Sequence, residues 1–163
     1  MRKQKGFSLI ELLIVVAIIL IIAAIAIPNL LRSRIAANES SAVGSIRTIN
    51  TAQVTYSSTY PNVGFTTTLA PLGGAAAACS VGATSTAACL IDDVLALGQK
   101  SGYTFAIGGG AGTVPEVTYN VTGGPVNVGQ TGQRSFCSDQ SGVIRFEATG
   151  APATCLTAGT PLQ

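Results

Sequence analysis

The stretch GFSLIELLIVVAIILIIAAIAIPNLL, residues 6–31, decides how this chain folds. Fifteen of the residues from 7 to 27 are Phe, Leu, Ile or Val, and together they favour membrane insertion by about 4.5–9 kcal/mol. A charged Glu costs about 2.5–3.5 kcal/mol at the centre of a bilayer and less near its edge, so insertion is favoured despite Glu11. The uncharged run from Leu12 to Leu31 is long enough for one helical crossing.

Three basic residues fix the expected orientation of this segment. Arg2, Lys3 and Lys5 all precede Gly6, and basic residues stay on the cytoplasmic side of a membrane helix. We therefore expect a cytoplasmic N-terminus and an external C-terminal domain. A secretory signal peptide is the first alternative, because the residues from 24 to 26 would suit a signal peptidase, but the apolar run is too long and contains a carboxylate. An ordinary signal anchor explains the length and leaves the carboxylate unexplained.

Composition limits the remaining possibilities. The chain has 163 residues, of which 10% are charged, and it contains neither His nor Trp. After one apolar segment there is room for a single modest domain. Without the three basic residues before Gly6, six basic residues stand against seven acidic ones. No basic patch with interleaved aromatic residues is present, so the sequence gives no support for nucleic-acid binding.

Residues 5–15, KGFSLIELLIV, resemble the class III leader junction of type IV pilins and the related pseudopilins. The resemblance covers about the first 35 residues closely and the rest of the chain only loosely. It implies that a prepilin peptidase cuts after Gly6 and that the new N-terminal residue, Phe7, is N-methylated. It also implies that Glu11 neutralises the terminal amine of a neighbouring subunit during assembly.

Physical chemistry is consistent with this role for Glu11, because an ammonium and a carboxylate are each costly in hydrocarbon and pairing offsets part of both costs. Phe7 and Glu11 are also one helical turn apart, so pairing within one chain is sterically possible. A third interpretation is that Glu11 only favours the N-terminus of a helix, where the dipole stabilises negative charge. The sequence does not decide whether Glu11 pairs with the amine of its own chain or with the amine of a neighbouring subunit.

The apolar helix is expected to continue beyond the membrane as an amphipathic helix. Apolar residues recur near one helical face: Ile35, Ala42, Ile46, Ile49 and Tyr56. Polar residues are assigned to the wetter faces: Arg32, Arg34, Glu39, Arg47 and Gln53. Pro28 removes one backbone donor and clashes with the preceding turn, so a bend or a locally open stretch is expected there. In the resembled family the matching proline lies where the helix can unwind in the filament.

The rest of the chain predicts a small β-rich head. Residues 73–88 have low complexity and predict a surface loop, and residues 89–98 predict a short helix that begins near Asp92 and Asp93. Strands are predicted at residues 102–108, 116–123, 134–139 and 142–148, with a hairpin turn at residues 139–142. The fold class is therefore α+β, with a long N-terminal helix packed on a small antiparallel sheet. The expected parts are a leader (1–6), a membrane or filament-core helix (7–31), an amphipathic half-helix (32–58) and an extracytoplasmic headgroup (59–163).

Four cysteines lie in the part expected to be outside the cell: Cys79, Cys89, Cys137 and Cys155. Disulfides are favoured in such a compartment, and four cysteines allow three pairings. The local pairs Cys79–Cys89 and Cys137–Cys155 need the fewest assumptions. The second pair would close a C-terminal loop, as the headgroup disulfide does in many of the pilins that this chain resembles. A zinc site would need all four thiolates at loose spacing and is disfavoured.

Catalysis and cofactors find little support. No His is present to act as a base, and Gly108-Gly109-Gly110 lacks the Lys and Ser/Thr of a phosphate-binding loop. Asp92 and Asp93 are assigned to a solvated helix start. Related pseudopilins bind calcium near the C-terminus, and by this resemblance Asp139 and Glu147 are the remaining candidates for calcium ligands. We therefore expect no enzyme, no cofactor and no metal.

The expected function is that of the major structural subunit of a type IV pilus, a homo-oligomeric helical filament. The resemblance implies a precursor in the bacterial inner membrane, an inner-membrane assembly platform, an outer-membrane secretin and an extracellular pilus. Motility, adhesion and secretion are all served by such filaments. Two alternatives are a pseudopilin of a type II secretion system and a monomeric membrane-anchored binding module.

Overall fold

The computed structural model describes residues 7–110, 112 and 114–162. Gly6 and the basic residues before it lie outside the described residues. The chain divides into two compact units, of which the first ends at Arg34 and the second begins at Ile35. One helix, α1 (Leu9–Thr59), contributes to both units, and each unit is described separately below.

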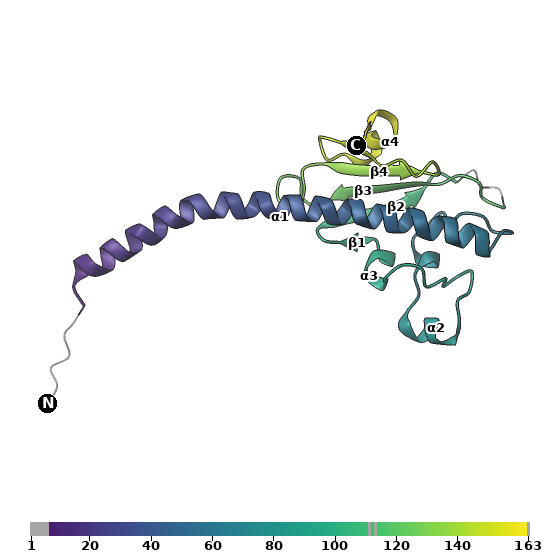
Figure 1. The fold of residues 1–163 in the computed structure, drawn as a ribbon, viewed down its shortest axis with the longest axis horizontal. Helices are drawn as coiled ribbons and strands as arrows, with labels where there is room; N and C mark the ends of the chain where they lie inside the picture. Colours follow the sequence, from purple (N-terminus) through teal and green to yellow (C-terminus); the bar gives the residue numbers. More distant parts are fainter. Residues whose placement is uncertain (1–6, 111, 113, 163) are drawn as a thin grey trace. The chain divides into compact units, whose positions relative to one another are not determined.

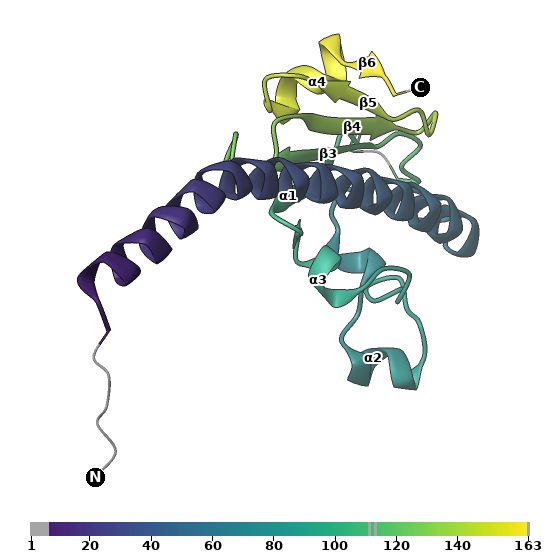
Figure 2. The same cartoon turned by 60° about the vertical axis from the view of Figure 1, so that its left-hand side comes forward.

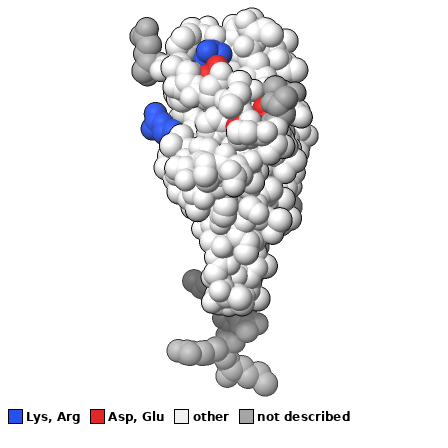
Figure 3. Space-filling view, turned by 90° about the vertical axis from the view of Figure 1, so that its right-hand side faces the viewer, with Lys and Arg blue, Asp and Glu red and all other residues white. Residues whose placement is uncertain are grey.

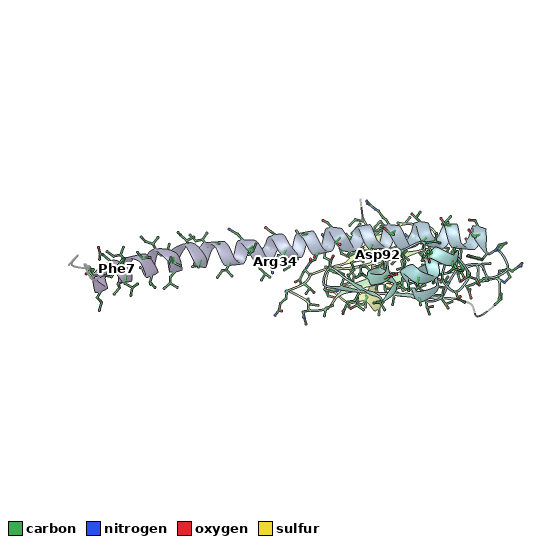
Figure 4. The ribbon with its side chains drawn as sticks, turned by 90° about the horizontal axis from the view of Figure 1, so that it is seen from below. Phe7, Arg34 and Asp92 are labelled. Atoms are coloured by element: carbon green, nitrogen blue, oxygen red, sulfur yellow. A yellow bond between two sulfur atoms is a disulfide. The ribbon has the colours of Figure 1, made fainter. Side chains whose placement is uncertain are left out.

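The N-terminal unit is helical from Leu9 onwards and leaves its apolar side chains uncovered. The exposed fraction is 81% for Phe7 and 42% for Leu31, and the large apolar residues between them are similarly exposed. Figure 4 shows side chains projecting on all sides of α1 between Phe7 and Arg34. In the described part of the chain, α1 is the one helix that is long and apolar enough to cross a membrane. The helix runs through Pro28 without interruption, so the locally open stretch expected there is not found.

The second unit contains a six-stranded antiparallel sheet whose strands follow one another in chain order. Figure 2 shows the later strands lying side by side in this order. The strands are β1 (Gln99–Lys100), β2 (Tyr103–Gly108), β3 (Asn120–Pro125), β4 (Ser135–Asp139), β5 (Arg145–Glu147) and β6 (Thr160–Pro161). Short helical segments join them: η1 (Ala70–Leu72), α2 (Ala76–Val81), α3 (Asp93–Ala96) and α4 (Pro152–Ala158). This arrangement confirms the expected α+β fold with a long helix on an antiparallel sheet.

The second half of α1 lies across one face of the sheet (Figure 1) and shares one core with it. The predicted apolar face of the helix is confirmed at Ala42, Ile46, Ile49 and Tyr56, all of which are at most 2% exposed. Close approach is possible partly because β3 has Gly123 under the helix. A Cβ on Gly123 would lie 2.9 Å from the Phe105 ring and 3.4 Å from Ile46 Cδ1, so only glycine fits comfortably here.

An ion pair between a buried carboxylate on α1 and a 41% exposed arginine side chain fixes this half of α1 to the rest of the second unit. Glu39 is only 7% exposed; its carboxylate accepts hydrogen bonds from the backbone N–H groups of Gln133 and Arg134 at 3.0 and 3.1 Å. The same carboxylate accepts from Nε and Nη2 of Arg134 at 2.8 and 2.7 Å. The guanidinium lies about 5.5 Å from the centres of the Phe136 and Phe146 rings, a cation–π arrangement. The assignment of Glu39 to a wet helix face was therefore wrong.

Gln53 was also assigned to a wet face, and it is fully buried. Its amide is satisfied by Thr66: Nε2 donates to the carbonyl and hydroxyl oxygens at 2.9 and 3.1 Å, and Oε1 accepts from the Thr66 N–H at 2.9 Å. Asn50 similarly donates to the hydroxyl of Ser138 in β4 at 2.9 Å. Buried polar side chains of α1 thus tie the helix to the loop after it and to the sheet, because each finds the partners that burial demands.

Several predicted elements differ from the observed ones. The strand predicted at residues 116–123 begins only at Asn120, because Glu116 instead pairs with Gly64 in an isolated bridge. The strand predicted at residues 142–148 is shortened to β5. Helix α2 forms inside the predicted loop at residues 73–88. The short helix after residue 89 is confirmed as α3, and Asp92 caps it by accepting from the Leu95 N–H at 2.9 Å.

Two disulfides hold the less regular parts of the second unit. Cys79 in α2 is bonded to Cys89, and Cys137 in β4 is bonded to Cys155 in α4. Both are local pairs of the kind that the sequence favours. The first closes the loop that contains α2, and the second attaches α4 to the sheet, where Cys137 and Cys155 are fully buried.

Replacing Glu39 by Ala is expected to lower the free energy of unfolding by about 1–3 kcal/mol, because two backbone N–H groups and a guanidinium lose their acceptor. The measurement is chemical unfolding of the full chain in detergent, followed by near-ultraviolet circular dichroism. Lys100→Ala is the matched control, because it breaks an exposed ion pair with Asp92, and such pairs contribute about 0–1 kcal/mol. Equal losses in the two variants would contradict a special role for Glu39.

The same contact predicts a pH dependence. Burial alone raises the pKa of Glu39, but hydrogen bonds from Arg134 and the Gln133 and Arg134 amides, with the Arg134 charge, hold it below its usual 4.5. A carboxyl with a lowered pKa stabilises the folded state above its unfolded pKa, and this stabilisation is lost as the pH falls through the folded pKa. Stability should therefore fall below about pH 4.5, and less steeply in Glu39→Gln than in the natural chain.

Peptide mapping of the oxidised protein without reduction is expected to recover the Cys79–Cys89 and Cys137–Cys155 linkages and no free thiol. Replacing both Cys137 and Cys155 by Ser should lower the free energy of unfolding by about 3 kcal/mol, the usual size for a loop of this length. Recovery of a Cys79–Cys137 or Cys79–Cys155 linkage would refute the local pairing.

Candidate functional site

The candidate site is the start of α1, where the single carboxylate of the apolar segment lies. Ser8 immediately precedes the helix, and its backbone N–H donates to Oε2 of Glu11 at 2.9 Å. The Glu11 and Leu12 N–H groups donate in turn to the Ser8 carbonyl at 3.1 and 3.3 Å. A carboxylate that reaches back to the N–H before the first turn satisfies a donor that the helix leaves unpaired. It also places negative charge at the positive end of the helix dipole.

This geometry has a direct consequence for Glu11. In the single chain the carboxylate serves as a helix N-terminal cap, which is one of the interpretations that the sequence left open. Only Oε2 is engaged, and Oε1 makes no hydrogen bond with any described residue. Glu11 is exposed. One carboxylate can therefore cap its own helix and still accept a second donor.

Phe7 lies beside this cap. It is the first described residue, it is 81% exposed, and it is bonded to Ser8, whose N–H already points at Glu11. If the bond between Gly6 and Phe7 is cut, the new amine appears one residue before the capped N–H. The site thus offers an amine position and a carboxylate near each other at one end of an apolar helix.

The remaining sequence candidates are used inside the second unit. Asp92 caps α3 and pairs with Lys100 at 2.7 Å. Asp139 pairs with Arg145 at 3.1 Å and accepts from the Ser141 N–H in the predicted hairpin turn. Glu147 accepts from Thr149 and from the Ala151 N–H. Within the part of the chain that the structure describes, no group of three or more His, Cys, Asp or Glu side chains could hold a metal ion.

The sequence left open a helix N-terminal role for Glu11, but it did not identify the hydrogen bond from the Ser8 N–H, although a signal for this bond was present. Ser8-Leu9-Ile10-Glu11 has the S-x-x-E spacing of a capping box before an apolar run. The Glu39–Arg134 pair had no comparable signal, because its partners are 95 residues apart in the chain.

Comparison with known proteins supports a particular class. Residues 1–27 match the prokaryotic N-terminal methylation motif. Over 40 residues the chain is 65% identical to the type IV wide pilus major component of Thermus thermophilus, which covers 24% of this chain and 30% of that relative. It is 46% identical over 54 residues to the type IV major pilin of Myxococcus xanthus, 33% of this chain and 24% of the relative.

A third relative belongs to a secretion apparatus. The chain is 41% identical over 64 residues to the type II secretion system core protein G of Vibrio cholerae, which covers 37% of this chain and 44% of that protein. Each match spans less than half of the relative's own length. No solved structure matches the chain.

The methylation motif and these relatives place the similarity in the N-terminal part of the chain, which contains the first part of the long helix α1. In this part the chain is similar to type IV pilins and to a type II secretion core protein.

Proposed function

We propose that this chain is the major structural subunit of a type IV pilus, cleaved after Gly6 and assembled into a helical filament through its apolar N-terminal helix. The observation that supports this most strongly is the uncovered apolar segment of α1 with a single carboxylate, Glu11, at its start. The two relatives that are named as major pilins support the same assignment. The role is structural and not catalytic.

The apolar segment needs an environment that removes it from water. Burial of apolar surface contributes about 25 cal/mol per Å², so a helix exposed on all sides is strongly driven towards a bilayer or towards other copies of itself. The basic residues before Gly6 favour a precursor in the inner membrane with its N-terminus in the cytoplasm. When the subunit moves from the bilayer to the core of a filament, its apolar helix segment is shielded from water both before and after the transfer.

The carboxylate distinguishes a filament subunit from an anchor. In a packed helical core, an ionised Glu11 needs a counter-charge, and the amine created at Phe7 of a neighbouring subunit supplies one. The capping hydrogen bond uses only one oxygen of Glu11, so the neighbour's amine can bind the other without breaking the cap. In the membrane, the amine of the same chain can bind this second oxygen of Glu11. During assembly, the amine of a neighbouring subunit then replaces the chain's own amine.

The superfamily supplies the expected partners. A prepilin peptidase would cut after Gly6, an inner-membrane platform would insert subunits into the filament base, and an outer-membrane secretin would let the fibre leave the cell. Motility and adhesion are both compatible with the resulting extracellular fibre.

A pseudopilin of a type II secretion system is the second candidate, and the similarity to the secretion core protein G favours it. A monomeric membrane-anchored binding module is the third. Shearing cells and testing the released material for this chain separates them. Long fibres made of this chain support the pilus, whereas retention of the chain in the cell envelope contradicts it.

The first prediction from this proposal concerns processing. Intact-mass analysis of the mature chain should show a protein that begins at N-methylated Phe7. Gly6→Leu should leave the precursor uncut, because a bulky side chain would crowd a peptidase subsite that this sequence fills with hydrogen alone. A mature chain that begins at Ile27 would indicate signal peptidase and would refute the pilin precursor.

A second prediction separates charge pairing from helix capping at Glu11. Glu11→Gln keeps an oxygen that can accept the Ser8 N–H but removes the charge, and Glu11→Val removes both. If Glu11 is the partner of a neighbour's amine, both variants bury an unpaired ammonium, a penalty of roughly 3–5 kcal/mol for each added subunit. Both strains should then hold processed protein in the membrane and display no fibres when sheared material is analysed by electron microscopy.

The controls for this prediction are the membrane level and the disulfides of each variant, which should equal those of the natural chain because Glu11 belongs to the first unit and both disulfides belong to the second. Normal fibres from Glu11→Gln together with none from Glu11→Val would assign Glu11 to helix capping. Normal fibres from both would leave it without a role in assembly.

A further inference from the structure

Charged side chains are sparse in this molecule, and most of those in the second unit are paired. The face drawn in Figure 3 shows only a few blue and red groups among uncharged residues. Three ion pairs account for six charged residues: Lys100–Asp92, Arg134–Glu39 and Arg145–Asp139. Within the described part of that unit, the side chains of Arg47 and Asp93 are exposed and make no ion pair or hydrogen bond. One is a cation and the other an anion.

Arg47 stands at one end of a hollow on the outer side of α1. The hollow has a volume of about 450 Å³ and is lined by Arg47, Thr48, Thr51, Ala52, Thr55 and Leu90. The three threonine hydroxyls each donate at 3.0 Å to a carbonyl one turn earlier in α1. Because these donors are already used, the lining offers mainly methyl and methylene groups beside a single positive charge.

Helix α3 and the residue after it present an exposed apolar side chain and a carboxylate, which complement the apolar lining and the positive charge of the first hollow. Leu97, which directly follows the last residue of α3, is 86% exposed, and Val94 within the helix is 55% exposed. Asp93 lies four residues before Leu97, so both side chains are on the same side of the turn, and both line a second hollow of about 330 Å³ with Ala96. The surface of α3 is therefore an exposed leucine with an unpaired carboxylate beside it.

We propose that α3 of one copy docks on the outer side of α1 in a second copy. Leu97 fills the threonine-lined hollow next to Leu90, and Asp93 pairs with Arg47. Glu147 also lies outside the three ion pairs, but its carboxylate already accepts three hydrogen bonds, which is why Asp93 is the partner chosen. Both surfaces belong to the second unit.

The contact has a consequence for assembly. The residues of the hollow and those of the α3 surface do not overlap, so one copy can use the two surfaces to bind two different neighbours. Repetition of such a head-to-tail contact builds a helical fibre when it does not close into a ring. This inference rests on the proposed pilus function and adds a second contact between subunits, outside the apolar helix core.

Charge exchange tests the pairing. Arg47→Glu and Asp93→Arg should each reduce the amount of fibre sheared from cells by at least about tenfold, because each juxtaposes like charges in a partly dry interface. The double variant, Arg47→Glu with Asp93→Arg, should restore fibres to near the level of the natural chain. Single variants with normal fibre levels, or a double variant without recovery, would overturn the pairing.

The natural chain in the same assay separates the two proposals. If the natural chain gives no fibres, the pilus function fails and the docking contact fails with it. If the natural chain gives fibres and the charge exchange behaves otherwise than stated, only the docking contact fails. Membrane levels and intact disulfides of each variant are measured alongside, and should be unchanged because neither side chain makes an ion pair or a hydrogen bond within the described part of its own copy.

A second measurement does not depend on charge. A photo-crosslinking amino acid at position 97, in fibres from the otherwise natural chain, should yield crosslinked dimers whose joined peptide contains residues 47–55 or Leu90, which line the hollow. The matched control places the same amino acid at Val143, which is 44% exposed in the second unit and outside both surfaces, and should not give that peptide. Crosslinks from position 97 to any other segment of a second copy would overturn the docking.

Discussion

The exposed apolar half of α1 is the constraint on which the rest of this molecule depends. A helix that exposes large apolar side chains is unstable in water, so under the proposed function the chain passes from a bilayer to a filament without exposing this segment to water. Glu11 is the one charged residue between Phe7 and Leu31, and its carboxylate accepts a hydrogen bond from the Ser8 N–H of the same chain. Under the same proposal, the second carboxylate oxygen of Glu11 accepts the amine of a neighbouring subunit.

The second half of the same helix has a different role, because it forms the core of the second unit together with the sheet. It packs against the sheet through a narrow apolar face together with buried polar groups. Glu39 clamps Arg134, and Gln53 binds the loop at Thr66. Because the buried side chains of Glu39 and Gln53 are hydrogen-bonded to the sheet and to the loop, they specify the position of the helix on the sheet more closely than apolar packing alone would.

The sequence predicts the parts of this structure that follow from local periodicity. The long helix, its buried face at Ile46 and Ile49, the capped start of α3 and the strands around Phe105 and Phe136 all carry local signals. The prediction of which helix residues are buried was wrong where burial depends on distant partners. Glu39 and Gln53 have the character of surface residues until the sheet and the loop that bind them are known. Helix α2 also escaped prediction, because six residues are too few for a helix that stands without tertiary support.

The measurement that tests the central claim most directly is a cryo-electron microscopy structure of the fibres that cells assemble from this chain. The account predicts that the apolar halves of α1 form the fibre core and that the methylated amine of Phe7 in one subunit lies about 2.7–2.9 Å from a carboxylate oxygen of Glu11 in a neighbour. A fibre core in which Glu11 contacts only its own chain, or in which these helices do not pack together, would contradict it.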